Sequence, residues 1–135
     1  MNGYRCFACA EKQAADFAGF LCPSCGGNLE ITYDYAAAAE KIEQSFLDGC
    51  SDIFHYAPLL PISKLDTPFP LRVGGTPLYA APRLGKSLGL RNLYLKDDTL
   101  NPSASIKDRA SAVAVRRAID IGATVVAAAS TGNAG

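Results

Sequence analysis

The sequence has no net charge, no long apolar run and only one histidine. Thirteen basic and thirteen acidic side chains cancel within 135 residues, so no large field attracts the chain to nucleic acid or to an anionic membrane. No apolar run approaches the ~20 residues that span a bilayer, and no charged-then-apolar leader opens the chain. These absences predict a cytoplasmic protein with no nucleic-acid or membrane partner.

The one histidine, His55, lies in an aromatic stretch where no carboxylate or cysteine is placed to orient its ring. A lone histidine in such surroundings more often packs or lies at the surface than catalyses. Cys50 has no neighbour that favours a thiolate, and we interpret it as a small buried hydrophobe. We expect neither residue to be catalytic.

The other four cysteines form two Cys-x-x-Cys pairs, and glycines follow the second pair. Without a signal peptide, this spacing favours metal binding over disulfides. Four thiolates so placed can bind one tetrahedral Zn²⁺ at about 2.3 Å, and the metal supplies folding energy that a short segment cannot gain from a core. Residues 1–34 are therefore predicted to form a zinc ribbon, with free thiols or a redox pair as the alternatives. The predicted ligands are Cys6, Cys9, Cys22 and Cys25.

Residues 35–70 are predicted to be a helical lead-in and a linker. The alanine-rich stretch 35–47 favours a helix, with Gly49 just past its end. Prolines 58 and 61 keep any helix over 53–60 short, and the two prolines in 63–70 are typical of a linker. Pro82 and Gly89 bracket a further short helix.

The rest of the chain is organised around residues 92–135. A strand over 92–96 leads through a polar turn to a helix that begins at Lys107, and a small-residue strand over 125–129 follows. As a βαβ unit of a parallel sheet, this segment would bring both polar loops to one edge, where open α/β sheets bind ligands.

The helix dipole disfavours a positive charge at Lys107, and a neutral amine is what a nucleophile toward an aldehyde requires. Ser103 or Ser105 can cap this helix. A solvated first-turn lysine is the alternative if Lys107 is considered alone. In the loop 130–133, successive amides can bind a carboxylate and Asn133 offers an amide to a ring substituent. The alternative for this loop is an ordinary cap to the next helix.

The run Asn101–Arg109, followed by Ser130–Asn133, resembles the fold-type II pyridoxal-phosphate enzymes, and among them the threonine synthase family most closely. The order of Gly75-Thr76-Pro77-Leu78, the lysine motif and the Gly-Asn loop is similar over residues 71–135, and the ribbon and residues 53–62 resemble the N-terminal extension of some members. The resemblance implies an α/β fold of the tryptophan synthase β type, with an open parallel sheet, of which 71–135 would be an incomplete part.

The resemblance also implies roles for individual residues. Lys107 would be the catalytic lysine that binds pyridoxal 5'-phosphate, and Asn133 would hydrogen-bond the 3-hydroxyl of the cofactor. Ser130, Thr131 and Gly132 would bind the carboxylate of the substrate. The implied reaction converts O-phospho-L-homoserine and water to L-threonine and phosphate, in a full-length enzyme that forms a homodimer and binds structural Zn²⁺. The 135 residues alone would be inactive.

Two departures loosen the substrate assignment more than the cofactor assignment. Ala104 and Ile106 replace the commoner Thr or Gly and Phe, and Phe54-His55-Tyr56 stands where Trp-Arg-Tyr is frequent. A threonine or serine dehydratase, or a cysteate synthase, would use the same lysine and asparagine, although Asp108-Arg109 favours threonine synthase over the dehydratases. Outside this class, a zinc-ribbon protein-binding module and a non-catalytic relative stay open.

Overall fold

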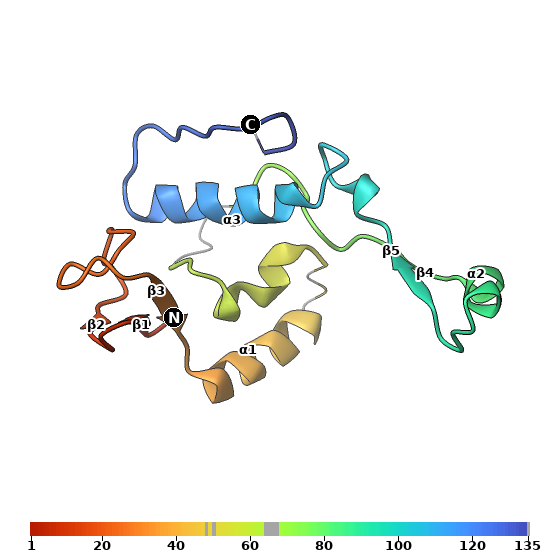
Figure 1. The fold of residues 1–135 in the computed structure, drawn as a ribbon, viewed down its shortest axis with the longest axis horizontal. Coiled ribbons are helices and arrows are strands. Elements are labelled where there is room, and N and C mark those ends of the chain that lie inside the picture. Colours follow the sequence, from red (N-terminus) through yellow and green to blue (C-terminus); the bar gives the residue numbers. More distant parts are fainter. Residues whose placement is uncertain (48, 50, 64–67, 135) are drawn as a thin grey trace.

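The structure of the protein, a computed structural model, describes residues 1–47, 49, 51–63 and 68–134. A cysteine-bearing sheet lies at one end, helices form the middle, and a hairpin projects at the other end (Figure 1). Cys50 and part of the predicted linker 63–70 lie outside the described residues. Within the described part of the chain, no helix is both long and apolar enough to cross a membrane.

The cysteine-bearing sheet is antiparallel and has the order β2-β1-β3. Its strands are β1 (Gly3–Cys6), β2 (Lys12–Gln13) and β3 (Leu29–Thr32). Tyr4 in the central strand lies opposite Gln13 on one side and Ile31 on the other. The buried side chains of this sheet and its loops are Cys6 and Cys22. The segment therefore has cysteines, and not an apolar cluster, at its centre.

The predicted helix over 35–47 is confirmed, and a short helix follows it. Helix α1 (Tyr35–Leu47) begins where the Asp34 carboxylate accepts a hydrogen bond of 3.0 Å from the Ala37 amide. The 3₁₀ helix η1 (Ile53–Leu59) is capped in the same way by Asp52, which accepts from the Phe54 amide at 2.8 Å. It includes Pro58 and ends before Pro61, so the prolines keep it short.

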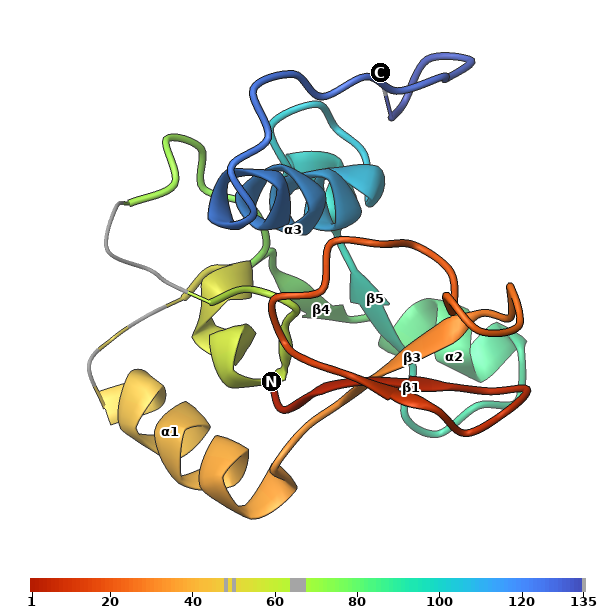
Figure 2. The ribbon, with the colours of Figure 1, turned by 90° about the vertical axis from the view of Figure 1, so that its left-hand side faces the viewer.

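The apolar core lies where η1 packs against helix α3 (Lys107–Asp120). Figures 1 and 2 show η1 between α1 and α3. The rings of Phe54 and Phe69 lie 5.4 Å apart, and the Ile53 amide donates to the Val73 carbonyl at 2.7 Å. The buried members of this core are Ile53, Phe54, Ile62, Val73 and Ala112. One face of α3 is thus held by the segments that precede it in the chain.

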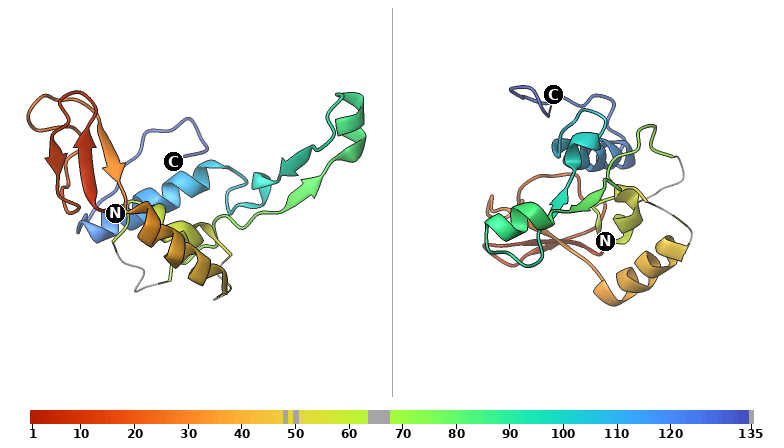
Figure 3. Two further views of the ribbon diagram at one scale, coloured as in Figure 1. Left: turned by 90° about the horizontal axis from the view of Figure 1, so that it is seen from below. Right: turned by 90° about the vertical axis from the view of Figure 1, so that its right-hand side faces the viewer.

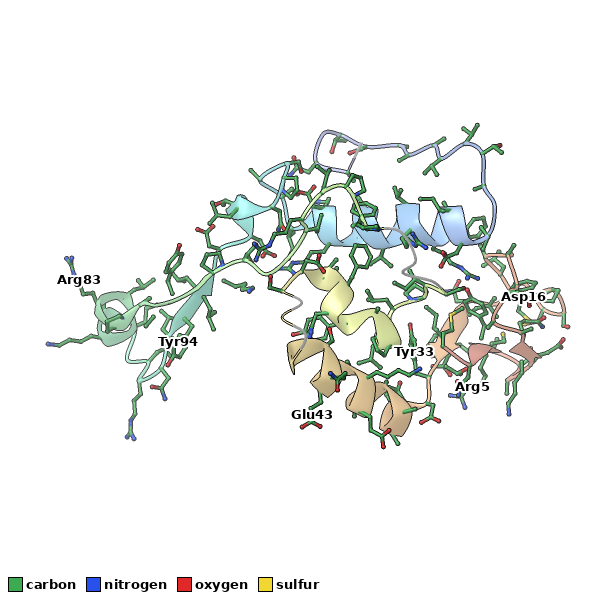
Figure 4. All side chains as sticks on the ribbon, turned by 180° about the vertical axis from the view of Figure 1, so that it is seen from behind. Arg5, Asp16, Tyr33, Glu43, Arg83 and Tyr94 are labelled. Carbon is green, nitrogen blue, oxygen red and sulfur yellow. The ribbon has the colours of Figure 1, made fainter. Side chains whose placement is uncertain are left out.

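A two-stranded antiparallel hairpin of β4 (Leu78–Ala80) and β5 (Tyr94–Lys96) projects from this body (Figure 3). Helix α2 (Pro82–Ser87) joins the strands, with Pro82 at its first position as predicted. The side-chain view places Arg83 and Tyr94 at the end of the molecule opposite Arg5 (Figure 4). The short helix η2 (Asp98–Leu100) then leads the chain back toward α3.

The predicted parallel βαβ unit is wrong for the described residues. Strand β5 pairs with β4, which precedes it, and both described sheets are antiparallel. The predicted strand 125–129 has no regular structure, and Val125 is 80% exposed. A strand requires a neighbour that completes its hydrogen-bond ladder, and none of the described segments pairs with 125–129.

Gly75 provides a test of how closely its loop packs against the backbone of Ser51. Its φ is +61°, and a Cβ there would lie 1.7 Å from the Ser51 carbonyl oxygen. Gly75→Ala should lower the free energy of unfolding by about 3 kcal/mol or more, because left-handed strain and backbone overlap add. Gly89→Ala is the matched control, since Gly89 has a φ of +69° but no atom within 4 Å of the added Cβ. Urea unfolding should show a smaller loss for Gly89→Ala, and equal losses would contradict the packing at Gly75.

Candidate functional site

The four predicted metal ligands lie together. Their sulfur atoms are all within 4.8 Å of one another. The Cys6 and Cys25 sulfurs are 3.5 Å apart, and the Cys9 sulfur is 3.6 Å from that of Cys22 and 3.5 Å from that of Cys25. A tetrahedral ion bound at about 2.3 Å needs sulfurs roughly 3.8 Å apart. The cluster can therefore hold one metal ion without rearrangement of the backbone.

The thiols of this cluster disturb one another's ionisation. The pKa of Cys6 is lowered to about 7, chiefly because the Cys9 backbone amide hydrogen-bonds its sulfur. The Glu11 amide lowers the pKa of Cys9, but its thiol neighbours Cys25 and Cys6 outweigh that amide and raise it to about 12. One thiolate therefore forms readily, and its negative charge disfavours ionisation of the neighbouring thiol. A divalent cation bound among the sulfurs would offset this repulsion.

Lys107 is the first residue of α3, as predicted. Its amide donates to the Ser105 hydroxyl at 3.2 Å, but the N-cap residue is Ile106, so neither Ser103 nor Ser105 occupies the predicted N-cap position. The amide of Ser103 donates to the Asp108 carboxylate at 2.7 Å, which ties the preceding turn to the helix. Ala104 in this turn has a φ of +56°, a left-handed conformation that costs an L-residue roughly 1–2 kcal/mol. The side chain of Lys107 is exposed.

The structure brings Lys107 together with part of the second predicted loop. The chain after α3 runs back along the helix, so that its last residues lie over the start of α3 (Figure 1). A cavity of about 500 Å³ is lined there by Lys107, Ala129, Ser130, Thr131 and Ala134. Gly132 and Asn133 continue the same loop but do not line the cavity.

The loop also directs backbone donors at one point. The amides of Gly132 and Ala134 both donate to the Ser130 hydroxyl oxygen, each at 3.0 Å. Gly132 has a φ of +150°, which side chains rarely allow, and an added Cβ would meet nothing within 4 Å. Two convergent amides on an open loop are the arrangement that binds a small anionic oxygen.

A partly buried polar network that the sequence did not predict joins the first turn of α3 to the hairpin. Arg109 donates to both carboxylate oxygens of Asp98, at 3.0 and 2.7 Å, and to the Thr76 hydroxyl at 3.1 Å. Thr76 in turn donates to Asp98 at 2.6 Å. Hydrogen bonds from Arg109, then from Thr76, hold the pKa of Asp98 well below its ordinary value, and the same pairing raises the pKa of Arg109.

Two further polar side chains support this network. The Asn101 side chain accepts from the Gly74 amide at 2.9 Å and donates to the Asp98 carbonyl at 3.0 Å, and Lys96 donates to the Thr76 carbonyl. Arg109 ends the run that resembles the family and Asp98 lies in the polar turn before that run, but the sequence carried no signal that paired them with a threonine before the hairpin. The network of Asp98 and Arg109 holds the first turn of helix α3 in place.

A second, polar cavity of about 360 Å³ lies beside this network, between it and η1. Its charged lining residues are Asp52, Lys96, Asp98 and Arg109, so their charges balance. His55 also lines it and is buried, with its Nδ1 3.0 Å from the Ser45 hydroxyl and its ring edge-on to Tyr56 at 4.6 Å. These contacts agree with the predicted packing role of His55.

Comparison with known proteins bears on the lysine cavity. Residues 70–135, which include Lys107 and its loop, match the family described as pyridoxal-phosphate dependent enzyme. The matched segment belongs to this family. The match therefore includes the cavity that Lys107 forms with the loop 129–134.

Nearly the whole chain is similar to proteins named threonine synthase. The Methanosarcina acetivorans protein is 36% identical over 133 residues, which are 98% of this chain and 32% of that protein. The Methanocaldococcus jannaschii protein is 39% identical over 130 residues, 96% of this chain and 32% of that protein. The Mycobacterium leprae protein is 46% identical over 78 residues, 58% of this chain and 21% of that protein.

The chain thus spans about a third of the length of the two archaeal relatives. Because they match almost all of it, the similarity includes the cysteine-bearing segment as well as the lysine segment. No solved structure matches the chain.

The Asp98–Arg109 pair predicts a pH dependence of stability. Because the folded state lowers the pKa of Asp98, its contribution is complete above the unfolded value of about 3.9 and is lost as the pH falls through the folded value. Asp98→Asn should therefore lower the urea midpoint by a constant amount between about pH 5 and 7, and by less below about pH 4. Asp16→Asn, at an exposed carboxylate, is the control. A wild-type advantage that grew on acidification would contradict the role of Asp98.

Proposed function

We propose that the full-length protein is a pyridoxal-phosphate-dependent lyase that converts O-phospho-L-homoserine and water to L-threonine and phosphate. The observation that carries the proposal is the shared cavity of Lys107 with Ser130 and Thr131, within a segment of the matching family. The similarity of nearly the whole chain to threonine synthases favours this substrate over others.

The residues around the cavity fit the cofactor and an amino-acid substrate. Its volume of about 500 Å³ lies in the range of small-molecule sites, roughly 300–1,000 Å³. Lys107 would bind the cofactor through its amine and Asn133 would donate to the 3-hydroxyl. Ser130, Thr131 and Gly132 would bind the substrate carboxylate, and the Gly132 amide, which here donates to the Ser130 hydroxyl, would be one of its donors. When bound, pyridoxal phosphate serves as an electron sink for the substrate carbons.

Lys107 is also the group that would move protons at the α- and β-carbons of the substrate. Lys96 is unsuited to this role, because it donates to the Thr76 carbonyl and lines the other cavity. Lys86 lies on α2 in the projecting hairpin. Lys107 is the lysine that lines the cavity with the loop 129–134.

A threonine or serine dehydratase, or a cysteate synthase, would place the same lysine and asparagine in the same roles. Products distinguish them in the full-length protein: threonine synthase releases phosphate from O-phospho-L-homoserine and forms L-threonine, whereas a dehydratase releases ammonia from threonine or serine. Ammonia release without phosphate release would replace our assignment with a dehydratase.

Replacing Lys107 tests the cofactor assignment. In the full-length protein, Lys107→Ala should lower kcat by at least about 10²-fold, because the group that binds the cofactor and moves the protons is lost. Borohydride reduction of the wild type followed by peptide mapping should find the cofactor on Lys107. Lys86→Ala is the matched control and should retain both activity and labelling. Labelling of another lysine in the wild type would refute the assignment.

We further propose that residues 1–34 form a ribbon around one structural Zn²⁺, that 35–70 lead from it, and that 71–135 are part of the cofactor domain. Four thiolates would fill a tetrahedral zinc site and leave no position for water, so the ion would stabilise the fold and take no part in the chemistry.

Metal analysis tests the zinc site. The full-length protein should contain about one zinc per chain, and chelation should lower the midpoint of thermal unfolding more than it lowers turnover. Cys22→Ser, which removes a buried ligand, should have the same effect without chelator, and Ser24→Ala should not. Loss of zinc with an unchanged unfolding midpoint would show that the metal does not stabilise the fold.

A further inference from the structure

Arg117 in the last turn of α3 makes the contacts from which we draw a further inference. Its Nη2 donates to the Tyr4 hydroxyl at 2.9 Å and to the carbonyls of Ala15 and Phe17 at 3.0 and 3.3 Å. Its guanidinium carbon also lies 6.0 Å from the centroid of the Tyr4 ring, within the range of a cation–π contact. One side chain thus bridges more than 100 residues of sequence.

The partners of Arg117 are set by the cysteine-bearing segment. Tyr4 lies in β1, two residues before Cys6, and its ring meets that of Phe17 edge-on at 6.3 Å. Ala15 and Phe17 lie between β2 and Cys22, in the stretch that joins the two cysteine pairs. The acceptors of Arg117 are therefore in place only when this stretch is folded around the cysteines.

Lys107 lies at the other end of α3, so a change in the direction of the helix would move Lys107. Lys107 and Arg117 are ten residues apart, or ~15 Å along the helix. If the contacts of Arg117 are lost, the last turn can swing about the core at Ala112, and a tilt of ~8° there would move Lys107, ~7.5 Å away along the helix, by ~1 Å. A displacement of about 1 Å can lower a rate by about 10²-fold. The Arg109 network at the first turn and the core at Ala112 resist such a tilt, but neither holds the last turn.

We propose that Arg117 is a positioning residue: it docks the cysteine-bearing segment onto the last turn of α3 and so fixes the helix on which Lys107 lies. The proposal rests on the proposed function only where it concerns Zn²⁺ and catalysis, because the docking contacts stand by themselves. A lysine can replace Arg117 only in part, since an ammonium has no planar face to lie against the Tyr4 ring.

Hydrogen exchange of the full-length protein, read by mass spectrometry, tests the docking. In Arg117→Met, amides of residues 14–20 and 114–120 should exchange together at least about tenfold faster than in the wild type. Tyr4→Phe removes one hydrogen bond and keeps the ring, so it should show a smaller change in the same two segments. Arg5→Met is the matched control, because Arg5 lies in the same sheet but pairs with Glu30, and it should change neither segment.

Unchanged exchange at 114–120 in Arg117→Met would overturn the proposal, as would an equal effect of Arg5→Met. If Arg117→Met does not fold, Tyr4→Phe decides, and no change in its 114–120 segment would overturn the proposal. Chelation of the wild type should speed exchange at 114–120, and chelation of Arg117→Met should add nothing there. If chelation speeds exchange in 1–34 but leaves 114–120 unchanged, the metal is structural and the coupling through Arg117 is wrong.

The catalytic readout separates this proposal from the proposed function. Arg117→Met should lower kcat about tenfold with little change in KM, and Arg117→Lys should restore part of it. Borohydride should still fix the cofactor to Lys107. Absence of zinc or of threonine formation in the wild type would refute the proposed function, while exchange in Arg117→Met would still decide the role of Arg117. A kcat equal to the wild-type value would refute the positioning of Lys107 by Arg117.

Discussion

Packing of η1 against one face of α3 is the interaction on which the described structure depends. The buried core there is small, with Ile53 and Phe54 on one side and Ala112 on the other. At roughly 1.5–3 kcal/mol for a fully buried large side chain, so few residues cannot by themselves fix a 14-residue helix in direction. Polar contacts at both ends of α3 therefore decide its orientation: the Arg109 network at the first turn and Arg117 at the last.

The polar contacts at the first turn explain why helix α3 begins at Lys107. The Ser105 hydroxyl accepts from its first amide, Asp108 ties it to the preceding turn, and Arg109 joins its first turn to the base of the hairpin. The left-handed backbone of Ala104 is strained, and the hydrogen bonds on either side of it hold the turn in this conformation. A residue that must face a cavity is thus held by its neighbours and not by contacts of its own side chain.

The sequence predicted the elements that short-range chemistry determines. Helix α1 follows from its alanines and from Gly49 after it, the prolines limit the length of η1, and the start of α3 follows from the polar turn before Lys107. The cysteine cluster was predictable because each Cys-x-x-Cys pair is local in the sequence, so that a single contact between the two pairs completes the cluster. The pairing of β5 with β4 was not, since the choice of a strand's neighbour depends on segments far away in the chain. Arg117 was beyond prediction for the same reason, because its partners precede it by about 100 residues or more.

The meeting of Lys107 with Ser130 was predicted correctly, but for the wrong reason. It was expected from two parallel strands, whereas the structure achieves it by reversing the chain after α3. Gly122, with a φ of +74°, and the hydrogen bond from the Ala123 amide to the Ala118 carbonyl form a C-terminal cap that turns the chain back.

Chain length then sets which residue arrives at the lysine. The 14 residues of α3 span ~21 Å, and an extended chain covers that distance in six or seven residues at ~3.3 Å each. Counting from Gly122 places residues 128–129 level with the start of the helix, next to Ala129 and Ser130, which line the cavity with Lys107. The same count holds whether residues 125–129 form a strand or not. The lengths of helix and return segment, both readable from the sequence, are therefore sufficient to bring the lysine and the serine loop together.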